Sequence, residues 1–317
     1  MRAPAIKKVL ITTGDVDGVG LEVSIKALQK LGPQKKTQFF LYRSLLAPAF
    51  RLSRFDRIQV LDLQHALQIK PNPNQIIEIV RTDSPACWVE EAGRACFQKK
   101  ADSIVTAPLS KQEIQAAGFS DIGHTDIFKR VTKEKTAFMA FMGPQFNVLL
   151  ITGHIPTSQV EKKITPALLK KAFQAAEKAR SLLPSSQAKK PLAVLGLNPH
   201  AGDQGLIGQF DEKILKPYLQ RHGKALRAQG PLVPDVAFLP ENWNKYSVYL
   251  AQYHDQGLIP FKMIHGFDAG VHLTLGLPIK RSSVDHGTAK DIFGQNKANP
   301  GSMIEALRWG VRLAHKG

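Results

Sequence analysis

Short apolar runs alternate with stretches of helical spacing along the whole chain, and this alternation limits the fold more than any other feature. The run at 9–12 leads into a helix-like segment that ends at Gly32-Pro33, and further apolar runs follow at 39–42 and 103–106. Strands that alternate with helices predict an α/β fold with a parallel or mixed sheet covered on both faces. The other strands are expected at 57–63, 137–142, 148–152, 192–197, 247–252 and 271–275, and the other helices at 86–99, 166–183 and 302–314.

The chain is long enough for two domains. It has 317 residues, and about 150 residues per domain is the usual expectation. The best boundaries lie near Gly123 and Ser282, which allows a discontinuous domain. We therefore expect one α/β domain at 1–123 plus 282–317 and a second at 124–281.

Composition excludes several classes of protein. Hydrophobic residues make up 43% and charged residues 22%, which is enough apolar content for a core and argues against disorder. Apolar runs reach neither the length of a membrane span, about 18 residues, nor that of a signal-peptide core, about 7–15 residues. The two cysteines, Cys87 and Cys96, make no disulfide framework. We expect a cytoplasmic protein with no membrane partner.

The net charge is strongly positive. There are 43 Lys and Arg against 26 Asp and Glu, a formal charge of +17. Such a charge can attract nucleic acid or an anionic substrate, but here the positive residues are scattered and no basic block is interleaved with aromatic residues. We favour a solvated basic surface, then an anionic substrate, and consider nucleic acid unlikely. The paired lysines are Lys7-Lys8, Lys35-Lys36, Lys99-Lys100, Lys162-Lys163, Lys170-Lys171 and Lys189-Lys190.

A glycine-rich turn, Thr13–Gly20, joins the first expected strand to the first helix. Free N–H groups at such a helix start can bind an anion. The spacing is G-x-x-x-G-x-G, however, and matches neither the dinucleotide fingerprint nor the P-loop. Asp15 and Asp17 would also repel a phosphate. We interpret the segment as a tight turn.

Three histidines each follow an apolar, strand-like run: His154, His200 and His254. The carboxyl edge of an open α/β sheet is where ligands bind. Three imidazoles meeting there could hold a divalent metal and leave coordination positions for a substrate. The alternative is that each histidine is separately hydrogen-bonded. Asp255 is a candidate partner for a ligand histidine, or a cap for the following turn.

The segment at 284–294, followed by Ala298-Asn299-Pro300, resembles the cofactor loop of isocitrate and isopropylmalate dehydrogenases. In those metal-dependent enzymes a similar H-G-[ST]-A loop wraps the adenosine of the nicotinamide cofactor. The resemblance explains why no Rossmann fingerprint is needed, the alternative being a structural glycine turn. It implies that the cofactor is bound by His286, Gly287, Thr288, Ala289 and Asp291.

Five separated stretches of the chain form a distinctive set: ITTGDVDGVGLE, TAPLSKQEIQAAGFSDIGHTDIF, LGLNPHAGDQGLIG, YHDQGLIPFK and GVHLTLGLPIKRSSVDHGTAKDIFG. Together they resemble the 4-hydroxythreonine-4-phosphate dehydrogenase family of vitamin B6 biosynthesis. The resemblance implies two α/β/α domains around mixed sheets, like isocitrate and isopropylmalate dehydrogenases, with the active site in the interdomain cleft. The first domain would carry the cofactor loop, and the second the metal and the dimer interface.

The same resemblance implies roles for individual residues. It makes His154, His200 and His254 the ligands of one divalent ion (zinc, magnesium or cobalt), with one ligand supplied by the partner subunit of a homodimer. The cofactor would be NAD or NADP. The implied substrate contacts are His124, Thr125, Lys262 and Arg281, and Lys262 or Lys111 could carry a proton.

His272 stands where the family usually has Asn, so it is an altered contact of the substrate pocket. Thr13, Val16 and Leu21 likewise replace prolines of the first loop. The resemblance implies oxidation of 4-phosphooxy-L-threonine to a 3-oxo acid, which loses CO₂ to give 3-amino-2-oxopropyl phosphate.

Two alternatives stay open. His272 favours a paralogue that oxidises another phosphorylated hydroxy acid, such as a phosphothreonate or phosphoerythronate. The charge favours a non-catalytic polyanion-binding protein, against which the three retained histidines argue.

Overall fold

The computed structural model describes residues 5–266 and 268–316 and divides the chain into two compact units. We describe each unit by itself. The first consists of Met1–Ala137, Phe267–His272 and Leu277–Gly317, and the second of Phe138–Gly266 and Leu273–Gly276. The first unit is therefore discontinuous, as expected, but it is larger than expected at both boundaries.

Packing explains why residues 124–137 belong to the first unit, although we expected them in the second. Helix α5 (His124–Thr132) packs on helix α3 (Pro85–Phe97) so tightly that a Cβ added at Gly93 would lie 2.8 Å from the Phe128 ring. Arg281 joins the same unit because it begins strand β12 (Arg281–Ser283), which pairs with strand β5 (Ser103–Thr106).

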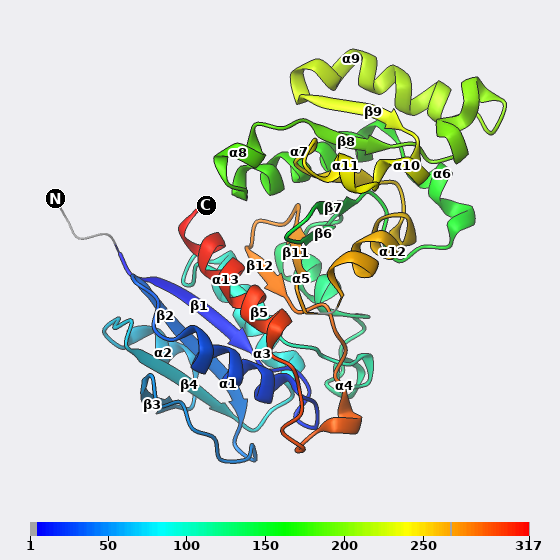
Figure 1. Cartoon of the computed structure of the whole chain (residues 1–317). Helices are drawn as coiled ribbons and strands as arrows, with labels where there is room; N and C mark the ends of the chain where they lie inside the picture. The colour runs from blue at the N-terminus through cyan, green and yellow to red at the C-terminus, as the bar shows by residue number, and fades with distance from the viewer. Residues whose placement is uncertain (1–4, 267, 317) are drawn as a thin grey trace. The chain divides into compact units, whose positions relative to one another are not determined.

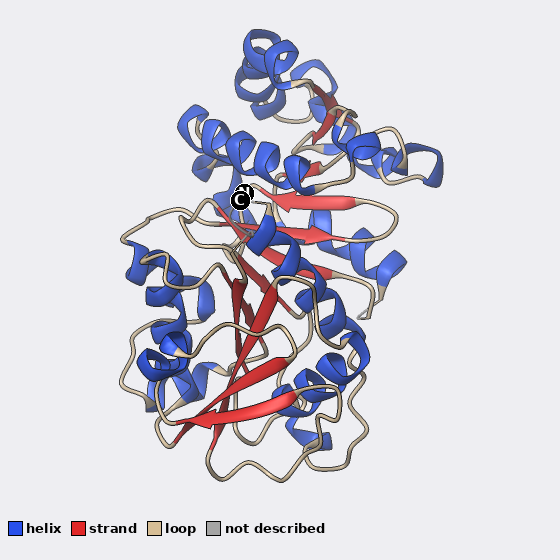
Figure 2. Ribbon diagram, turned by 90° about the vertical axis from the view of Figure 1, so that its left-hand side faces the viewer, coloured by secondary structure: helices blue, strands red, loops and turns tan. Residues whose placement is uncertain are grey.

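In the described part of the first unit the strands lie in the order β3-β4-β2-β1-β5-β12, and neighbouring strands are parallel. The central strands β1 and β2 contain continuous buried apolar runs, VLI and FFLY, as is usual for strands covered on both faces. Figure 2 shows helices on both sides of the strands. The remaining strands are β1 (Lys7–Thr12), β2 (Thr37–Ser44), β3 (Asp56–Val60) and β4 (Gln75–Arg81).

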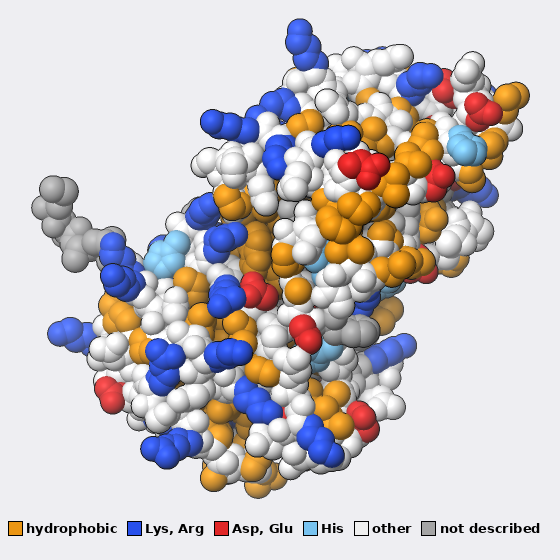
Figure 3. Space-filling view, viewed as in Figure 1, with side chains coloured by type: hydrophobic (Ala, Val, Ile, Leu, Met, Phe, Trp, Pro, Cys, Tyr) orange, Lys and Arg blue, Asp and Glu red, His pale blue; other side chains and the backbone are white. Residues whose placement is uncertain are grey.

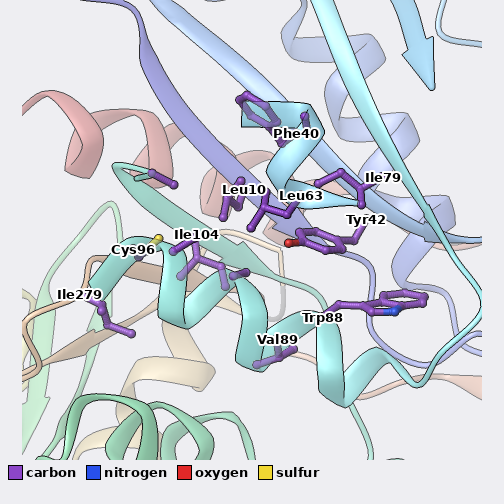
Figure 4. Packing of buried hydrophobic residues seen from close by; sticks show 14 of the residues in the cluster. Leu10, Phe40, Tyr42, Leu63, Ile79, Trp88, Val89, Cys96, Ile104 and Ile279 are labelled. Carbon is purple, nitrogen blue, oxygen red and sulfur yellow. The ribbon is translucent and has the colours of Figure 1, made fainter. Parts of the chain in front are cut away.

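Helices α1 (Gly20–Leu31) and α13 (Gly301–His315) contact each other, and α13 also contacts β1, β5 and β12 (Figure 1). A hydrophobic cluster joins the strands to α3 (Figure 4). In it Tyr42 and Trp88 stack with ring centroids 6.4 Å apart, and the Trp88 Nε1–H donates to Asp83. The other helical segments of this unit are α2 (Leu63–Gln68), α4 (Lys111–Ala116) and the 3₁₀ turn η4 (Lys290–Ile292).

Among the described residues of the second unit the strands lie in the order β6-β7-β10-β8-β9. The β6–β7 pair is antiparallel, and the other neighbouring pairs are parallel. They are β6 (Phe138–Met142), β7 (Asn147–Leu150), β8 (Leu192–Leu195), β9 (Ala228–Leu232) and β10 (Tyr249–Ala251); β11 (Val271–Leu275) is divided between the units.

In the second unit, helix α12 (His254–His265) packs on strands β7 and β10. Helices α7 and α9 contact each other. The segments other than α12 are η1 (Thr157–Gln159), α6 (Val160–Lys163), α7 (Pro166–Leu182), α8 (Ser185–Ala188), η2 (Pro199–Gly205), η3 (Asp211–Leu215), α9 (Lys216–Leu226), α10 (Pro234–Ala237) and α11 (Pro240–Trp243).

The predicted α/β class and most predicted strands are confirmed, but strands β9 and β12 were not predicted and two further corrections are needed. The strand expected at 57–63 ends at Val60, because Asp62 caps a new helix by accepting a hydrogen bond from the His65 N–H at 2.7 Å. Strand β4 was not predicted, although its sequence QIIEIVR is rich in β-branched residues.

Lysine and arginine side chains are spread over the visible face rather than gathered in one patch (Figure 3). This distribution agrees with the interpretation of the +17 charge as a solvated surface. Among the described residues there is no helix with the length and hydropathy needed to cross a membrane.

We predict that Gly93→Ala destabilises the protein by about 1–3 kcal/mol, because the new methyl group meets the Phe128 ring. Alanine normally favours a helix over glycine, so a loss can only come from overpacking. Urea denaturation measures the change. Gly123→Ser is the control, since a Cβ there meets nothing within 4 Å; equal stability of Gly93→Ala and wild type would contradict the packing.

Candidate active site

Three adjacent parallel strands of the second unit, β7, β10 and β8, carry the predicted metal histidines just beyond their carboxyl ends. His154 follows β7, His254 begins α12 directly after β10, and His200 lies in the turn after β8. Parallel pairing brings these three ends to one edge of the sheet. The predicted placement of the histidines at strand ends is confirmed.

The structure brings together two of the three histidines. The rings of His154 and His254 have centroids 5.2 Å apart, and His254 Nδ1 lies 2.6 Å from the Asp255 carboxylate. A proton shared there leaves His254 Nε2 as the donor for a metal. His200 is exposed and does not join them: within residues 5–266 and 268–316, no three His, Cys, Asp or Glu side chains are placed to hold one ion.

Gln252, which is fully buried, ties the three loops together. Its backbone oxygen accepts a hydrogen bond from the Thr152 hydroxyl at 2.7 Å, in the loop before His154. Its side-chain amide donates to the Leu195 oxygen at 2.5 Å, at the end of β8. Gln256 adds a bond from its amide to the Gly196 oxygen at 2.7 Å. One residue therefore links the segments that carry His154, His200 and His254.

A second buried polar group shapes the turn that carries His200. The Asp211 carboxylate accepts hydrogen bonds from the Leu197 N–H at 2.7 Å and from the backbone and side chain of Asn198 at 3.1 and 2.9 Å. The turn itself holds six consecutive residues at positive φ, from His200 (φ 51°) to Gly205 (φ 94°). Such a conformation is unfavourable for most residues, so the Asp211 bonds are what we expect to hold it in place.

The first unit contains a hollow of about 390 Å³ beside the ends of β5 and β12. It unites residues predicted for two different ligands: His124, expected to contact the substrate, and His286, Gly287 and Thr288, expected to bind the cofactor. Strands β1, β5 and β12 are parallel neighbours, so the hollow lies where the loops after these strands meet. Its other lining residues are Pro108, Leu109, Ser110, Ser283 and Val284, which sequence reasoning did not assign.

Arg281, the first residue of β12, is only 3% exposed to solvent. Its guanidinium donates two hydrogen bonds to the Thr106 hydroxyl, at 3.1 and 2.8 Å. Burial lowers the pKa of Arg281 to about 9, so it stays cationic at neutral pH. Burial, then the charges of Arg281 and His272, hold the pKa of His124 well below its usual value. His124 is therefore neutral at pH 7, and its buried Nε2 has no hydrogen-bond partner among the described residues.

The other predicted residues lie in separate places. Thr125 follows His124 in the first turn of α5, and Lys262 is half-buried on α12. Lys111 is exposed at the start of α4, next to Ser110 but outside the lining of the hollow. In the cofactor loop, Ala289 adopts a left-handed conformation with φ 45°, and Asp291 is exposed in η4.

The glycine-rich turn is tight, as interpreted from the sequence. Gly14 has φ 67°, and a Cβ there would lie 1.8 Å from the Pro108 oxygen, so only glycine fits. Asp15 is buried and accepts a hydrogen bond from the Ser110 N–H at 2.8 Å. The sequence shows Asp15 between glycines but contains no signal that its side chain is buried.

The residues present fit both expected ligands. Paired imidazoles, one of them held by a carboxylate, suit zinc or cobalt. Around the hollow, the buried Nε2 atoms of His124 and His286 have no partner within the described part of the chain, and Gly287 leaves open space beside it. These groups can hydrogen-bond a polar ligand there.

Comparison with known proteins shows similarity along nearly the entire chain. The family model described as "Pyridoxal phosphate biosynthetic protein PdxA" matches residues 20–310. A 4-hydroxythreonine-4-phosphate dehydrogenase of Sulfurihydrogenibium sp. (strain YO3AOP1) is 35% identical over 326 residues, covering 96% of this chain and 98% of that protein. A D-threonate 4-phosphate dehydrogenase of Cupriavidus necator is 32% identical, covering 96% of both.

Solved structures of related proteins are also similar to this chain. A 4-hydroxythreonine-4-phosphate dehydrogenase from Burkholderia phymatum has a TM-score of 0.74 and 29% identity, covering 97% of this chain and 98% of that one. A β-decarboxylating dehydrogenase from Thermococcus kodakarensis shares the fold, with a TM-score of 0.52 and 13% identity over 97% of this chain and 82% of that one. The expected likeness to the isocitrate and isopropylmalate dehydrogenase fold is thereby confirmed.

We predict that His124 makes the protein less stable in mild acid. Its pKa is lower in the folded than in the unfolded chain, so the unfolded chain binds more protons below about pH 6.5. The free energy of unfolding therefore falls as the pH drops, by at most about 1.4 kcal/mol per pH unit from this group. Urea denaturation between pH 7.5 and about pH 5 should show that the free energy of unfolding falls less steeply in His124→Gln than in wild type. An equally steep fall in both proteins would contradict the burial of a neutral imidazole.

Proposed function

This chain belongs to the PdxA family of pyridoxal phosphate biosynthetic proteins, and we propose that it oxidises a phosphorylated hydroxy acid using NAD or NADP and a divalent metal ion. The family relationship supports an oxidoreductase, because the relatives described above are named dehydrogenases. The details of substrate, cofactor and metal are the content of the proposal.

One observation carries the proposal: the hollow of the first unit is lined both by His124 and by the predicted cofactor residues His286, Gly287 and Thr288. A dehydrogenase must bring the substrate carbon and the nicotinamide into contact. A single cavity that joins a substrate residue to the cofactor loop meets this requirement. A polyanion-binding surface would need no such cavity.

His124 lines the hollow, and Arg281, bonded to Thr106, acts electrostatically on it. Arg281 is cationic and buried, so its attraction for a phosphate or carboxylate is little screened by water. His124, kept neutral beside it, can donate or accept one hydrogen bond without adding repulsion between cations. We assign the anionic group of the substrate to this pair.

His154 and His254 are the metal ligands that one subunit supplies, and we propose that His200 of a second subunit completes the set. His200 lies on an exposed turn that also exposes Leu206, at 84%, and α12 exposes Met263, at 77%. Large apolar side chains exposed next to the predicted ligands are typical of a subunit interface. Because such a dimer is symmetric, two equivalent sites would form.

A nicotinamide cofactor held by His286, Gly287 and Thr288 would supply the hydride acceptor, and a metal ion held by His154 and His254 would supply positive charge for the oxidation and the loss of CO₂. The chain's own residues bind and orient. Asp255 holds the His254 ring, and Gln252 fixes the loops on either side of it. We assign the transfer of a proton to Lys262, which is half-buried on the helix that His254 begins, rather than to the exposed Lys111.

We propose 4-phosphooxy-L-threonine as substrate, oxidised to a 3-oxo acid that decarboxylates to 3-amino-2-oxopropyl phosphate, in pyridoxal phosphate biosynthesis. A second candidate is D-threonate 4-phosphate, the substrate in the name of the Cupriavidus necator relative. These substrates differ beside the carboxylate, with an ammonium in one and a hydroxyl in the other. A protonated imidazole repels an ammonium, so we assign the choice between the two substrates to His272, which acts electrostatically on His124.

We predict turnover of one of these two substrates, followed as the absorbance of reduced nicotinamide. Chelation should abolish the activity and added Zn²⁺, Co²⁺ or Mg²⁺ should restore it. His272→Asn should shift the ratio of kcat/KM values toward 4-phosphooxy-L-threonine. Activity that persists in chelator would refute the metal, and absence of turnover with both substrates and both cofactors would refute the proposed reaction.

A mixing experiment tests the shared metal site. His200→Ala and His254→Ala should each be folded but inactive, with metal binding lost. Coexpressed, they should recover about a quarter of wild-type activity, because half of the dimers are mixed and each mixed dimer has one intact site. His154→Ala with His254→Ala is the matched control and should recover nothing, since both ligands come from one subunit. Equal results for the two mixtures would contradict the assignment of His200 to the partner.

A further inference from the structure

The glycine-rich turn at 13–20 makes direct contacts with the predicted cofactor loop. The Val19 N–H donates to the Thr288 oxygen at 2.9 Å. The Lys290 ammonium lies 3.0 Å from the Asp15 carboxylate and 2.8 Å from that of Asp17. A turn that does not match a phosphate-binding fingerprint thus holds another loop through one backbone bond and two ion pairs.

Asp15 connects both walls of the hollow. Its side chain is fully buried, and one carboxylate oxygen accepts the Ser110 N–H at 2.8 Å while the other faces Lys290. Ser110 and Thr288 both line the hollow. Because one buried carboxylate bonds Ser110, just before α4, and pairs with Lys290, the first residue of η4, the spacing of the segments that line the hollow depends on it.

We propose that Lys290 is a positioning residue that fastens the 286–290 loop to Asp15 and Asp17 and so sets the affinity of the hollow for the nicotinamide dinucleotide. The inference deepens the proposed function, on which it rests for the identity of the ligand. It assigns a role to the glycine-rich turn, to Asp17 and to Lys290, which the sequence resemblance left without one.

Two physical effects support this role. Lys290 supplies the positive charge next to Asp15, and without it a buried carboxylate would be left uncompensated beside the loop that is to bind a dinucleotide carrying phosphates. A hydrogen bond to the Asp17 carboxylate and the ion pair with Asp15 raise the pKa of Lys290, so the ammonium stays charged throughout the neutral range. The lysine therefore both places the loop and offsets the repulsion that Asp15 and Asp17 would exert.

The backbone directs the loop toward the turn. Ala289, immediately before Lys290, is left-handed with φ 45°, and η4 starts at Lys290 itself. The Phe293 and Ile292 N–H groups close this short turn on the Lys290 and Ala289 oxygens at 3.2 Å. The loop thus reverses direction at Ala289, where Lys290 reaches Asp17.

The test compares Lys290→Met, which keeps length but removes charge, with Lys290→Arg, which keeps the charge. If the loop is correctly placed only a tenth of the time in Lys290→Met, the Kd and KM for NAD rise about tenfold. We expect kcat within about twofold of wild type, since Lys290 is not assigned to the chemistry. Lys290→Arg should restore affinity. Lys297→Met is the control, an exposed lysine of the same segment with no ion pair among the described residues.

Amide hydrogen exchange of the protein without added cofactor gives a readout independent of activity. In Lys290→Met the Val19 amide, which bonds the Thr288 oxygen, should exchange faster than in wild type, Lys290→Arg and Lys297→Met. Unchanged exchange together with unchanged NAD affinity would overturn the inference. If wild type itself binds neither NAD nor NADP, the proposed function fails, and the exchange data alone decide whether Lys290 positions the loop.

Discussion

Parallel pairing of buried strands is the constraint on which the rest of the structure depends. It sends the chain out of the sheet at the same edge after every strand, so residues far apart in sequence come together. In the first unit the loops after β1, β5 and β12 meet around the hollow, which joins His124 to the 284–288 segment. In the second unit the ends of β7, β10 and β8 carry the three histidines to one edge.

Buried polar side chains then set the geometry of these loops. Asp15, Asp211 and Gln252 are each almost fully buried, and each bonds backbone groups of another loop. A buried carboxylate or amide destabilises the fold unless it is hydrogen-bonded. Moving a loop away from such a side chain would break its hydrogen bonds and so destabilise the protein. This is why irregular segments, such as the left-handed turn at His200, can hold defined positions.

The positive charge of the chain divides into two parts with different consequences. Most lysines and arginines lie on the surface, where solvent and salt screen them (Figure 3). Arg281 is buried, and its charge lowers the pKa of a neighbouring histidine. For anion recognition one buried guanidinium matters more than the +17 total.

The sequence by itself determined the α/β class, the main strands and the placement of the three histidines after strands, because apolar periodicity and turn residues act locally. The sequence analysis missed strand β4 and the capped helix α2. It also placed residues 124–137 in the second unit instead of the first. Only the tertiary structure decided that His154 lies against His254 while His200 lies apart, and that Asp15 meets Ser110 and Lys290. Those contacts join residues up to 275 positions apart in the chain and depend on which strands become neighbours, which no local pattern specifies.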